Sequence, residues 1–410
     1  MRKPLLALSI SAFAIGTSEF IIMGLLPNLA HTFDVSIPKA GLLVSAYAIS
    51  VTVGSPLVAL ALSRSDRKRS LLILMSIFIA GNILCALAPT YSLLLAARIV
   101  TALCHGAFFG IGSIVAANLV PRHERNQAIA LMFSGLTLAN VLGVPAGTAL
   151  GQAFGWRFAF WALVPIGLIA AAGLLRLVPS QPAEVLHLRH EFHAILRPQV
   201  QLVLALSTLS SVAMFCVFTY IAPMLEVVTH LTPHTVTWVL VLFGVGITLG
   251  NLVGGRLSDW SQMAVLIGGL ILLIAVFLFM PLTQTRTIPA VIMIFVWGFI
   301  HFGVGSPLQA RIVEQAKGAP NLASTLNQGA FNLGNALGAG LGGLVLTAGY
   351  GYQRLPLASS AVTFVALLIA LLALLYDRRD RARDSRFSVP STQYPEARDA
   401  LPITLLRSVR

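Results

Sequence analysis

Charged residues are scarce in this sequence: Asp, Glu, Lys and Arg make up 10% of its 410 residues, whereas hydrophobic residues make up 57%. A soluble domain carries about 25% charged residues, so this composition excludes an ordinary soluble enzyme and predicts a membrane protein. The chain holds only three cysteines, all inside apolar runs, which excludes a disulfide framework. It also lacks the Gly-Lys pair of a phosphate-binding loop, which argues against ATP-driven transport.

Apolar runs long enough to cross a bilayer recur from residue 5 to residue 376. A helix needs about 20 such residues to span a hydrocarbon core roughly 30 Å thick. Each run must be helical, because lipid offers no partner for unpaired backbone groups and the alternation of barrel strands is missing. The sequence therefore predicts an all-α membrane protein with twelve transmembrane helices, at residues 5–27, 40–62, 71–88, 92–119, 127–152, 157–178, 200–225, 235–256, 263–281, 288–312, 322–348 and 356–376.

The basic residues follow the predicted membrane topology. The net charge of +13 suggests a nucleic-acid partner, but 22 of the 27 lysines and arginines fall at the chain ends and in alternate connections, all on one side of the predicted membrane. The positive-inside rule then places both termini in the cytoplasm and makes a nucleic-acid partner unnecessary. An even number of spans agrees with this orientation.

The two halves of the chain repeat one six-helix unit. LANVLG at 138–143 matches LGNALG at 333–338, and HGAFFGIGS from His105 matches HFGVGS from His301, at offsets of 195 and 196 residues. Each match pairs helices six spans apart, so the two copies run in the same direction through the membrane, as in transporters with a site between halves. We predict an N-terminal bundle at 1–178, a cytoplasmic linker at 179–199, a C-terminal bundle at 200–376 and a disordered cytoplasmic tail at 377–410.

Glu19 places a carboxyl group inside the first apolar run, about 21 Å along the helix at 1.5 Å per residue. A charge at this depth costs a few kcal/mol at least, so the group must pair, face an aqueous cavity or hold its proton. We predict that Glu19 is the proton-coupling residue. The alternative is a protonated carboxyl that only bonds a neighbouring helix.

Other polar residues interrupt the predicted helices. Arg98 needs backbone carbonyls or a carboxylate as a partner, and Glu19 lies in the same half of the bilayer; the alternative is an arginine that reaches the interface. His105 and His301 occupy equivalent repeat positions, which favours packing next to glycine over a proton relay. The candidate cavity-lining residues or charge partners are Arg98, His105, Asn140, His301 and Asn335.

A stripe of small residues marks the fifth predicted span. Gly143, Gly147 and Gly151 recur at i, i+4 and i+8, and Pro145 interrupts the hydrogen-bond ladder between them. The stripe permits close helix packing and the proline favours a bend, so packing alone and a conformational role both stay open. The eleventh span repeats the glycine spacing without a proline, which predicts packing only.

Two short turns place charges at helix ends on the predicted cytoplasmic side. SRSDRKRS follows the second span, and GGRLSDW follows the eighth. Arg256 and Asp259 of the second turn are candidates for a latch between helices that breaks during transport. The alternative is that these charges only fix the topology.

Taken together, these residues resemble the major facilitator superfamily, in particular its drug:proton antiporter branch. The strings GTSEFIIMGLLP, HGAFFGIGS, GLTLANVLGVPAGT, GWRFAFW and GAFNLGNALGA are closer still to AraJ- and YdhP-like bacterial sugar or drug efflux permeases. The resemblance covers residues 1–376. It implies alternating access by two rocking bundles, a bacterial inner-membrane location, export coupled to inward proton movement, and an acidic residue in the first span, matched by Glu19.

The family's motifs carry over residue by residue. Its antiporter signature is matched by Gly143, Pro145 and Gly147, and its loop signature by Gly255 and Asp259 with Arg256 between them. In the first half, Ala59 and Ser63 stand where Gly and Asp are usual, which puts an aspartate latch there in doubt. The basic residues that remain in that copy are Arg64, Arg67 and Lys68.

The sequence thus predicts a proton-coupled efflux antiporter that exports a small organic solute and acts without a cofactor. Proton-coupled uptake is the alternative, because composition does not separate export from import. An intramembrane enzyme would need a convergent Ser/His/Asp set or a metal cluster at depth, and the sequence offers neither. We expect protons, a small molecule and the lipid bilayer as partners, no nucleic acid, and a monomer.

Overall fold

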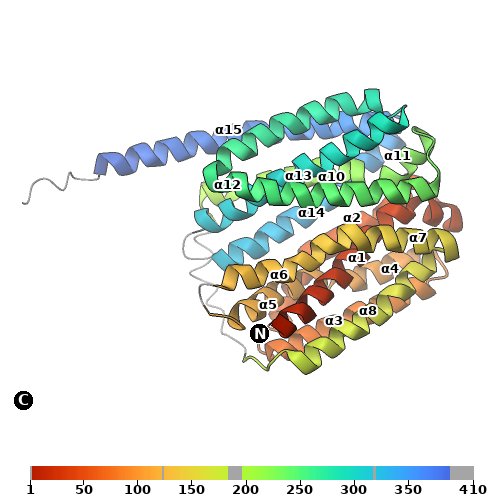
Figure 1. The fold of residues 1–410 in the computed structure, drawn as a ribbon, viewed down its shortest axis with the longest axis horizontal. Helices are drawn as coiled ribbons and strands as arrows, with labels where there is room; N and C mark the ends of the chain where they lie inside the picture. Colours follow the sequence, from red (N-terminus) through yellow and green to blue (C-terminus); the bar gives the residue numbers. More distant parts are fainter. Residues whose placement is uncertain (1, 122–123, 183–195, 317–319, 388–410) are drawn as a thin grey trace, which may run out of the picture.

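The computed structural model describes residues 2–121, 124–182, 196–316 and 320–387. In this part of the chain the helices lie side by side along one common direction (Figure 1). The first half comprises α1 (Arg2–Phe33), α2 (Ile37–Ala61), α3 (Arg67–Leu87), α4 (Tyr91–Ala102), α5 (His105–Asn118), α6 (Arg125–Leu138), the π-helical turn η2 (Ala139–Gly143), α7 (Val144–Phe154) and α8 (Trp156–Leu177). The second half comprises α10 (Pro198–Phe218), α11 (Ile221–Val227), α12 (Pro233–Thr283), α13 (Thr287–Gln315), α14 (Pro320–Thr347), the short 3₁₀ helix η3 (Tyr352–Arg354) and α15 (Leu355–Phe387).

The predicted helical spans are confirmed. Among the described residues, eleven helical stretches are long and apolar enough to cross a membrane. One of them, α12, has 51 residues and is broken at Ser261, where φ is −161° and ψ is 103°. It therefore supplies both the eighth and the ninth predicted span, and the twelve spans expected from hydropathy all fall on helices.

Local sequence explains where several helices begin. Ser36, Asp66, Thr90 and Thr232 each accept a hydrogen bond from the backbone N–H three residues later, at the starts of α2, α3, α4 and α12. Gly155 joins α7 to α8 as a single-residue link with φ of +92°, a conformation that side chains other than glycine's rarely allow. Short links of this kind hold successive helices antiparallel.

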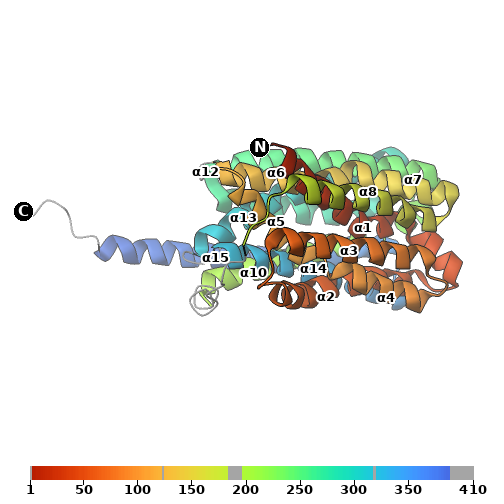
Figure 2. The same ribbon diagram turned by 90° about the horizontal axis from the view of Figure 1, so that it is seen from below.

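The two halves meet along a central interface. Helix α1 packs on α6, α7 and α8 of its own half, while α2 packs against α14 and α7 packs against α12 of the other half. The first described residue, Arg2, and the end of α15 lie at the same end of the bundle (Figures 1 and 2), which we call the terminal end. The candidate residues of α1 and α14 lie in the interior, where these two halves touch.

The chain after residue 376 differs from the expected tail. Helix α15 continues to Phe387, beyond the apolar run. Arg311 of α13 donates two hydrogen bonds to the carboxylate of Asp377, at 2.6 and 2.7 Å, and this ion pair extends the packed part of α15 past the predicted boundary. Most of the predicted linker, at 183–195, and the rest of the tail, at 388–410, lie outside the described residues.

Candidate functional site

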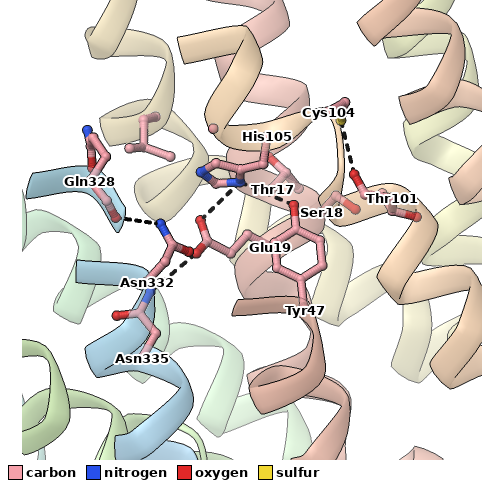
Figure 3. A network of polar contacts seen from close by, with 12 residues as sticks. Thr17, Ser18, Glu19, Tyr47, Thr101, Cys104, His105, Gln328, Asn332 and Asn335 are labelled. Atoms are coloured by element: carbon pink, nitrogen blue, oxygen red, sulfur yellow. Dashed lines mark hydrogen bonds and ion pairs between the residues drawn. The ribbon is translucent and has the colours of Figure 1, made fainter. Parts of the chain in front are cut away.

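Glu19 lies on α1 at the interface between the halves and is 6% exposed. Two side chains approach its carboxylate. Asn335 of α14 donates from Nδ2 to Oε1 at 3.4 Å, and His105 of α5 places Nδ1 3.8 Å from Oε2 (Figure 3). The carboxyl group is therefore shared by both halves of the molecule, with an amide on one side and an imidazole on the other.

A tyrosine extends this polar network within the first half. The hydroxyl of Tyr47 on α2 lies 3.2 Å from His105 Nδ1 (Figure 3), and the two rings meet edge to face with centroids 5.9 Å apart. Tyr47 is 1% exposed and His105 is 6% exposed, so the two groups are held away from bulk solvent. Together they form a continuous chain of polar atoms from Tyr47 through His105 to Glu19.

Arg98 is fully buried, and its guanidinium group bonds the backbone of α1. It donates to the carbonyl oxygens of Ser18, at 2.6 Å, and Glu19, at 3.2 Å, and it stacks 4.1 Å from the centroid of the Tyr47 ring. Of the two partners expected for Arg98, the structure shows the backbone carbonyls; within the described residues it makes no ion pair with the Glu19 carboxylate. Arg98 therefore supports α1 at the position of Glu19 and leaves the carboxylate to other groups.

Two polar side chains at or beside this network, Tyr47 and Asn82, were not among the sequence-based candidates. Tyr47 lies in an apolar run with no distinguishing pattern, so nothing in the sequence singled it out. Asn82 on α3 accepts a hydrogen bond from Ser18 Oγ at 3.0 Å and donates to the Phe78 carbonyl at 2.8 Å. An amide inside an apolar span is a signal of the same kind as Glu19, and Asn82 was therefore detectable.

The remaining candidates lie outside the network. Asn140 of η2, the repeat equivalent of Asn335, donates to the Leu136 carbonyl of its own helix at 3.1 Å. His301, the equivalent of His105, is 7% exposed, and its Nδ1 has no hydrogen-bond partner among the described residues. The structure thus brings together Glu19, His105 and Asn335 with Arg98 beside them, but it does not join Asn140 or His301 to them.

The glycine stripe of the fifth span packs against the helix that carries Glu19. A Cβ atom added at Gly143, Gly147 or Gly151 would overlap, respectively, the side chain of Thr17, Ile21 or Leu25 of α1. The π-helical turn Ala139–Gly143 ends just before Pro145, whose ring nitrogen offers no hydrogen-bond donor, so the helix departs from regular α-helical hydrogen bonding beside the proline. In the second half, Gly334, Gly338 and Gly342 of α14 pack in the same way on α10, and that helix has no proline or π turn between them.

The charged turns lie at the terminal end, away from Glu19. Arg256 and Asp259 of α12 are exposed, and neither has an ion pair within the described part of the chain, so no latch is formed in this structure. Gly255 has open space around it. In the other turn Arg64 is exposed, Lys68 is half-buried and Arg67 is buried.

An aspartate that the motif comparison did not single out organises the first turn. Asp66 accepts hydrogen bonds from the backbone N–H of Arg69 at 3.1 Å and from Ser180 Oγ, in the segment after α8, at 2.6 Å. Desolvation raises the pKa of this carboxyl, but the hydrogen bonds from Ser180 and from backbone N–H groups together outweigh it and hold the pKa below its ordinary value. Asp66 thus ties α3 to the end of the first half, in a turn where the usual aspartate of the loop motif is replaced by Ser63.

The chemistry available at this site is proton binding and hydrogen bonding. Within the described residues, no three His, Cys, Asp or Glu side chains come together in a way that could hold a metal ion. Glu19 is the ionisable group at the meeting point of the halves, and its partners are neutral or weakly basic. A carboxyl group in this position can take up or release a proton while the halves move relative to one another.

Comparisons with known proteins agree with this architecture. The family model described as Major Facilitator Superfamily matches residues 8–324. The Escherichia coli inner membrane transport protein YdhP is 48% identical over 374 residues, covering 91% of this chain and 96% of YdhP. The putative transporter AraJ of E. coli is 35% identical over 386 residues, covering 93% and 98%, and a chloramphenicol resistance protein of Streptomyces lividans is 36% identical over 377 residues, covering 90% and 96%.

Solved structures show the same fold at low sequence identity. A D-xylose-proton symporter superposes with a TM-score of 0.75 at 16% identity, covering 90% of this chain and 96% of the symporter. A bacterial homologue of the human lysosomal transporter Spinster, in an inward-facing and occupied conformation, gives a TM-score of 0.71 at 17% identity with the same coverage. The chain is a multi-pass membrane transporter and belongs to the major facilitator superfamily.

Proposed function

We propose that this transporter is a proton-coupled antiporter that exports a small organic solute across the bacterial inner membrane, with both termini in the cytoplasm. The observation that carries the proposal is the position of Glu19, a buried carboxyl group that touches both halves and makes no ion pair with Arg98 among the described residues. A buried carboxyl group that is not held in a direct ion pair with an arginine can exist in both protonation states, which proton coupling requires.

The energetics of one proton are sufficient for a neutral cargo. A proton that moves down 100 mV supplies about 2.3 kcal/mol, which supports a solute ratio of roughly fortyfold. Because the charges at the site are few and Arg98 is committed to backbone carbonyls, the site favours neutral or weakly polar solutes over multiply charged ones. In the proposed cycle Glu19 takes a proton from the outside, the halves rock, and the proton leaves inward while the solute leaves outward.

Export is supported by the relatives. The S. lividans protein is described as a chloramphenicol resistance protein, and resistance to a compound that acts inside the cell is consistent with its removal. Chloramphenicol, a neutral molecule, is therefore a suitable first probe. Uptake by symport is the competing outcome, since a D-xylose-proton symporter has this fold.

The test compares the wild type with Glu19→Gln in proteoliposomes that contain a pH-sensitive dye. Glu226→Gln is the matched control, because Glu226 of α11 is also partly buried but belongs to the other half and lies outside the Glu19 network. An outward solute gradient should drive protons in the opposite direction in the wild type and in the control, and the proton flux should be lost in Glu19→Gln. Proton and solute movement in the same direction would contradict antiport, and an undiminished flux in Glu19→Gln would contradict the role of Glu19.

The cargo is sought in cells that express the same variants, with and without an uncoupler, by comparing small molecules inside and outside. A solute that leaves only with the wild type and an intact proton gradient identifies the cargo. Accumulation of that solute inside the cells would show import instead.

A further inference from the structure

Asn335 is the residue through which the second half reaches Glu19. Its amide donates to the Glu19 carboxylate at 3.4 Å, and both side chains are at least nine-tenths buried. The same helix also touches the first half on either side of this contact: Ser45 Oγ donates to the Ala336 carbonyl at 3.1 Å, and Thr52 Oγ1 lies 3.4 Å from the Gly329 carbonyl. Asn335 therefore lies inside a seam between the halves, and at this point the seam includes an ionisable group.

The repeat-equivalent residues of Asn335 and Glu19 do not form the corresponding contact. Asn140, at the equivalent position of the first half, bonds its own helix, and the position equivalent to Glu19 is Phe215. The glycines beside Asn335 hold α14 close to α10, since a Cβ at Gly334 or Gly338 would overlap that helix. The close packing of α14 on α10 thus fixes the position from which the Asn335 amide reaches Glu19.

Among the described residues, the other ionisable groups around Glu19 come from the first half. Arg98 reaches it from α4, His105 from α5, and Tyr47 from α2, with Cys85 and Cys104 nearby on α3 and at the start of α5. The described residues of α14 that face the site, Asn332 and Asn335, are amides and do not titrate. A change in the charge of Glu19 therefore affects the second half through its hydrogen bond with the uncharged amide of Asn335.

We propose that Asn335 is a positioning residue that couples the charge of Glu19 to the relative position of the two halves. This inference rests on the proposed function of Glu19. A hydrogen bond from an amide to an ionised carboxylate is roughly twice as strong as one between neutral groups. Ionised Glu19 therefore holds α14 in the arrangement seen here, and a proton on Glu19 weakens the link and favours separation of the halves by about tenfold.

The experiment measures the distance between the halves as a function of pH. Spin labels are attached at His31→Cys in α1 and Thr285→Cys after α12, two exposed positions in different halves, while the three native cysteines are buried. Pulsed electron paramagnetic resonance on the full-length protein in liposomes, from pH 5 to 9, gives the distribution of distances between the two labels. This distribution gives the populations of the arrangement seen here and of the arrangement in which the halves are separated. In the wild type, the ratio of the two populations should change by about tenfold across this pH range. In Asn335→Ala, this ratio should be nearly independent of pH.

Controls separate this inference from the proposed function. Asn140→Ala removes the repeat-equivalent amide and Asn332→Ala removes a buried amide one turn away on α14; both should respond like the wild type. Asn335→Leu, which keeps the size of the side chain, serves if the alanine variant does not fold, and it should also be flat. A pH response that survives in Asn335→Ala or Asn335→Leu but is lost in Glu19→Gln would overturn the role of Asn335 and leave that of Glu19 intact. A response that persists in Glu19→Gln would overturn both, with His105→Gln showing whether the imidazole titrates instead.

Discussion

The packing of α7 on α1 gives a quantitative prediction at Gly147. A Cβ atom there would overlap Cδ1 of Ile21 and lie 2.9 Å from its Cγ1. Overpacking of a well-packed core costs about 1–3 kcal/mol, and replacing a helical glycine with alanine returns up to about 1 kcal/mol. We therefore expect Gly147→Ala to lower the free energy of unfolding by about 0.5–2 kcal/mol.

The matched control is Gly340→Ala in α14, where no atom lies within 4 Å of an added Cβ. It should be neutral or slightly stabilising, because only the backbone term applies. The assay is reversible unfolding in mixed micelles with increasing SDS, followed by tryptophan fluorescence. Proton-driven transport of the cargo is measured in parallel for both variants.

A second substitution tests whether the clash itself is the cause. Ile21→Val removes the overlapping Cδ1 atom and by itself should cost about 0.5–1.5 kcal/mol. In the double variant Gly147→Ala with Ile21→Val, the total loss should be smaller than the sum of the single losses by about 1 kcal/mol. Additive losses would refute the reasoning that this glycine sets the distance between α1 and α7.

Three further predictions follow from single contacts. Arg98→Lys should lower the free energy of unfolding by about 2–3 kcal/mol, because an ammonium group cannot bond two carbonyls and stack on the tyrosine ring at once; unchanged unfolding in the SDS assay would contradict this. Tyr220→Phe removes the hydroxyl that donates to the Ala339 carbonyl at 2.8 Å and should lower the free energy of unfolding by about 1 kcal/mol; unchanged unfolding in the SDS assay would contradict a stabilising role of this hydrogen bond. Asp66→Ala should lower the free energy of unfolding by about 1 kcal/mol, because the helix cap is lost. Since the pKa of Asp66 is lowered in the folded protein, the stabilisation by this carboxylate should be complete above the ordinary pKa of 3.8 and be lost as the pH falls below that value. A stability difference between wild type and variant that persists undiminished in strong acid would contradict the assignment.

The fold was largely predictable because the bilayer limits what an apolar chain can do. Runs of the right length must be helical in lipid, so the twelve spans followed from hydropathy, and the repeat gave the relation between the halves. The sequence also indicated an irregular helix at Pro145, since a missing N–H disturbs the hydrogen-bond ladder, and the π-helical turn Ala139–Gly143 lies next to this proline. The Arg311–Asp377 ion pair was not predictable, because it joins helices that are adjacent only after folding.

The candidate site was predictable in its residues but not in its contacts. Glu19 and Arg98 stood out because each is costly in lipid. Their partners depend on packing: Asn335 is 316 residues away from Glu19 in sequence, and the approach of Arg98 to the backbone of α1 has no sequence pattern. Depth in the membrane could be estimated from position along a helix, whereas the direction in which a side chain points could not.

The repeat shows which features of the site are inherited and which belong to one half. Close packing through glycine occurs in both copies, at α1 with α7 and at α10 with α14, so it belongs to the shared framework. The polar network is different: the positions equivalent to Glu19, Arg98 and Tyr47 are Phe215, Ile294 and Phe243.

In the second half, this region is filled by aromatic packing. Phe243 lies with its ring centroid 4.9 Å from those of both Phe218 and Trp297, and Phe20, the neighbour of Glu19, approaches Phe215 at 6.1 Å. An apolar wall on one side and a carboxyl group on the other mean that the charge changes in the first half, and the second half contacts the changing group through the uncharged Asn335 amide. A symmetric pair of carboxyl groups would change the charge of both halves, whereas in this arrangement a proton changes the charge of the first half and alters the second half only through the strength of the Asn335 hydrogen bond.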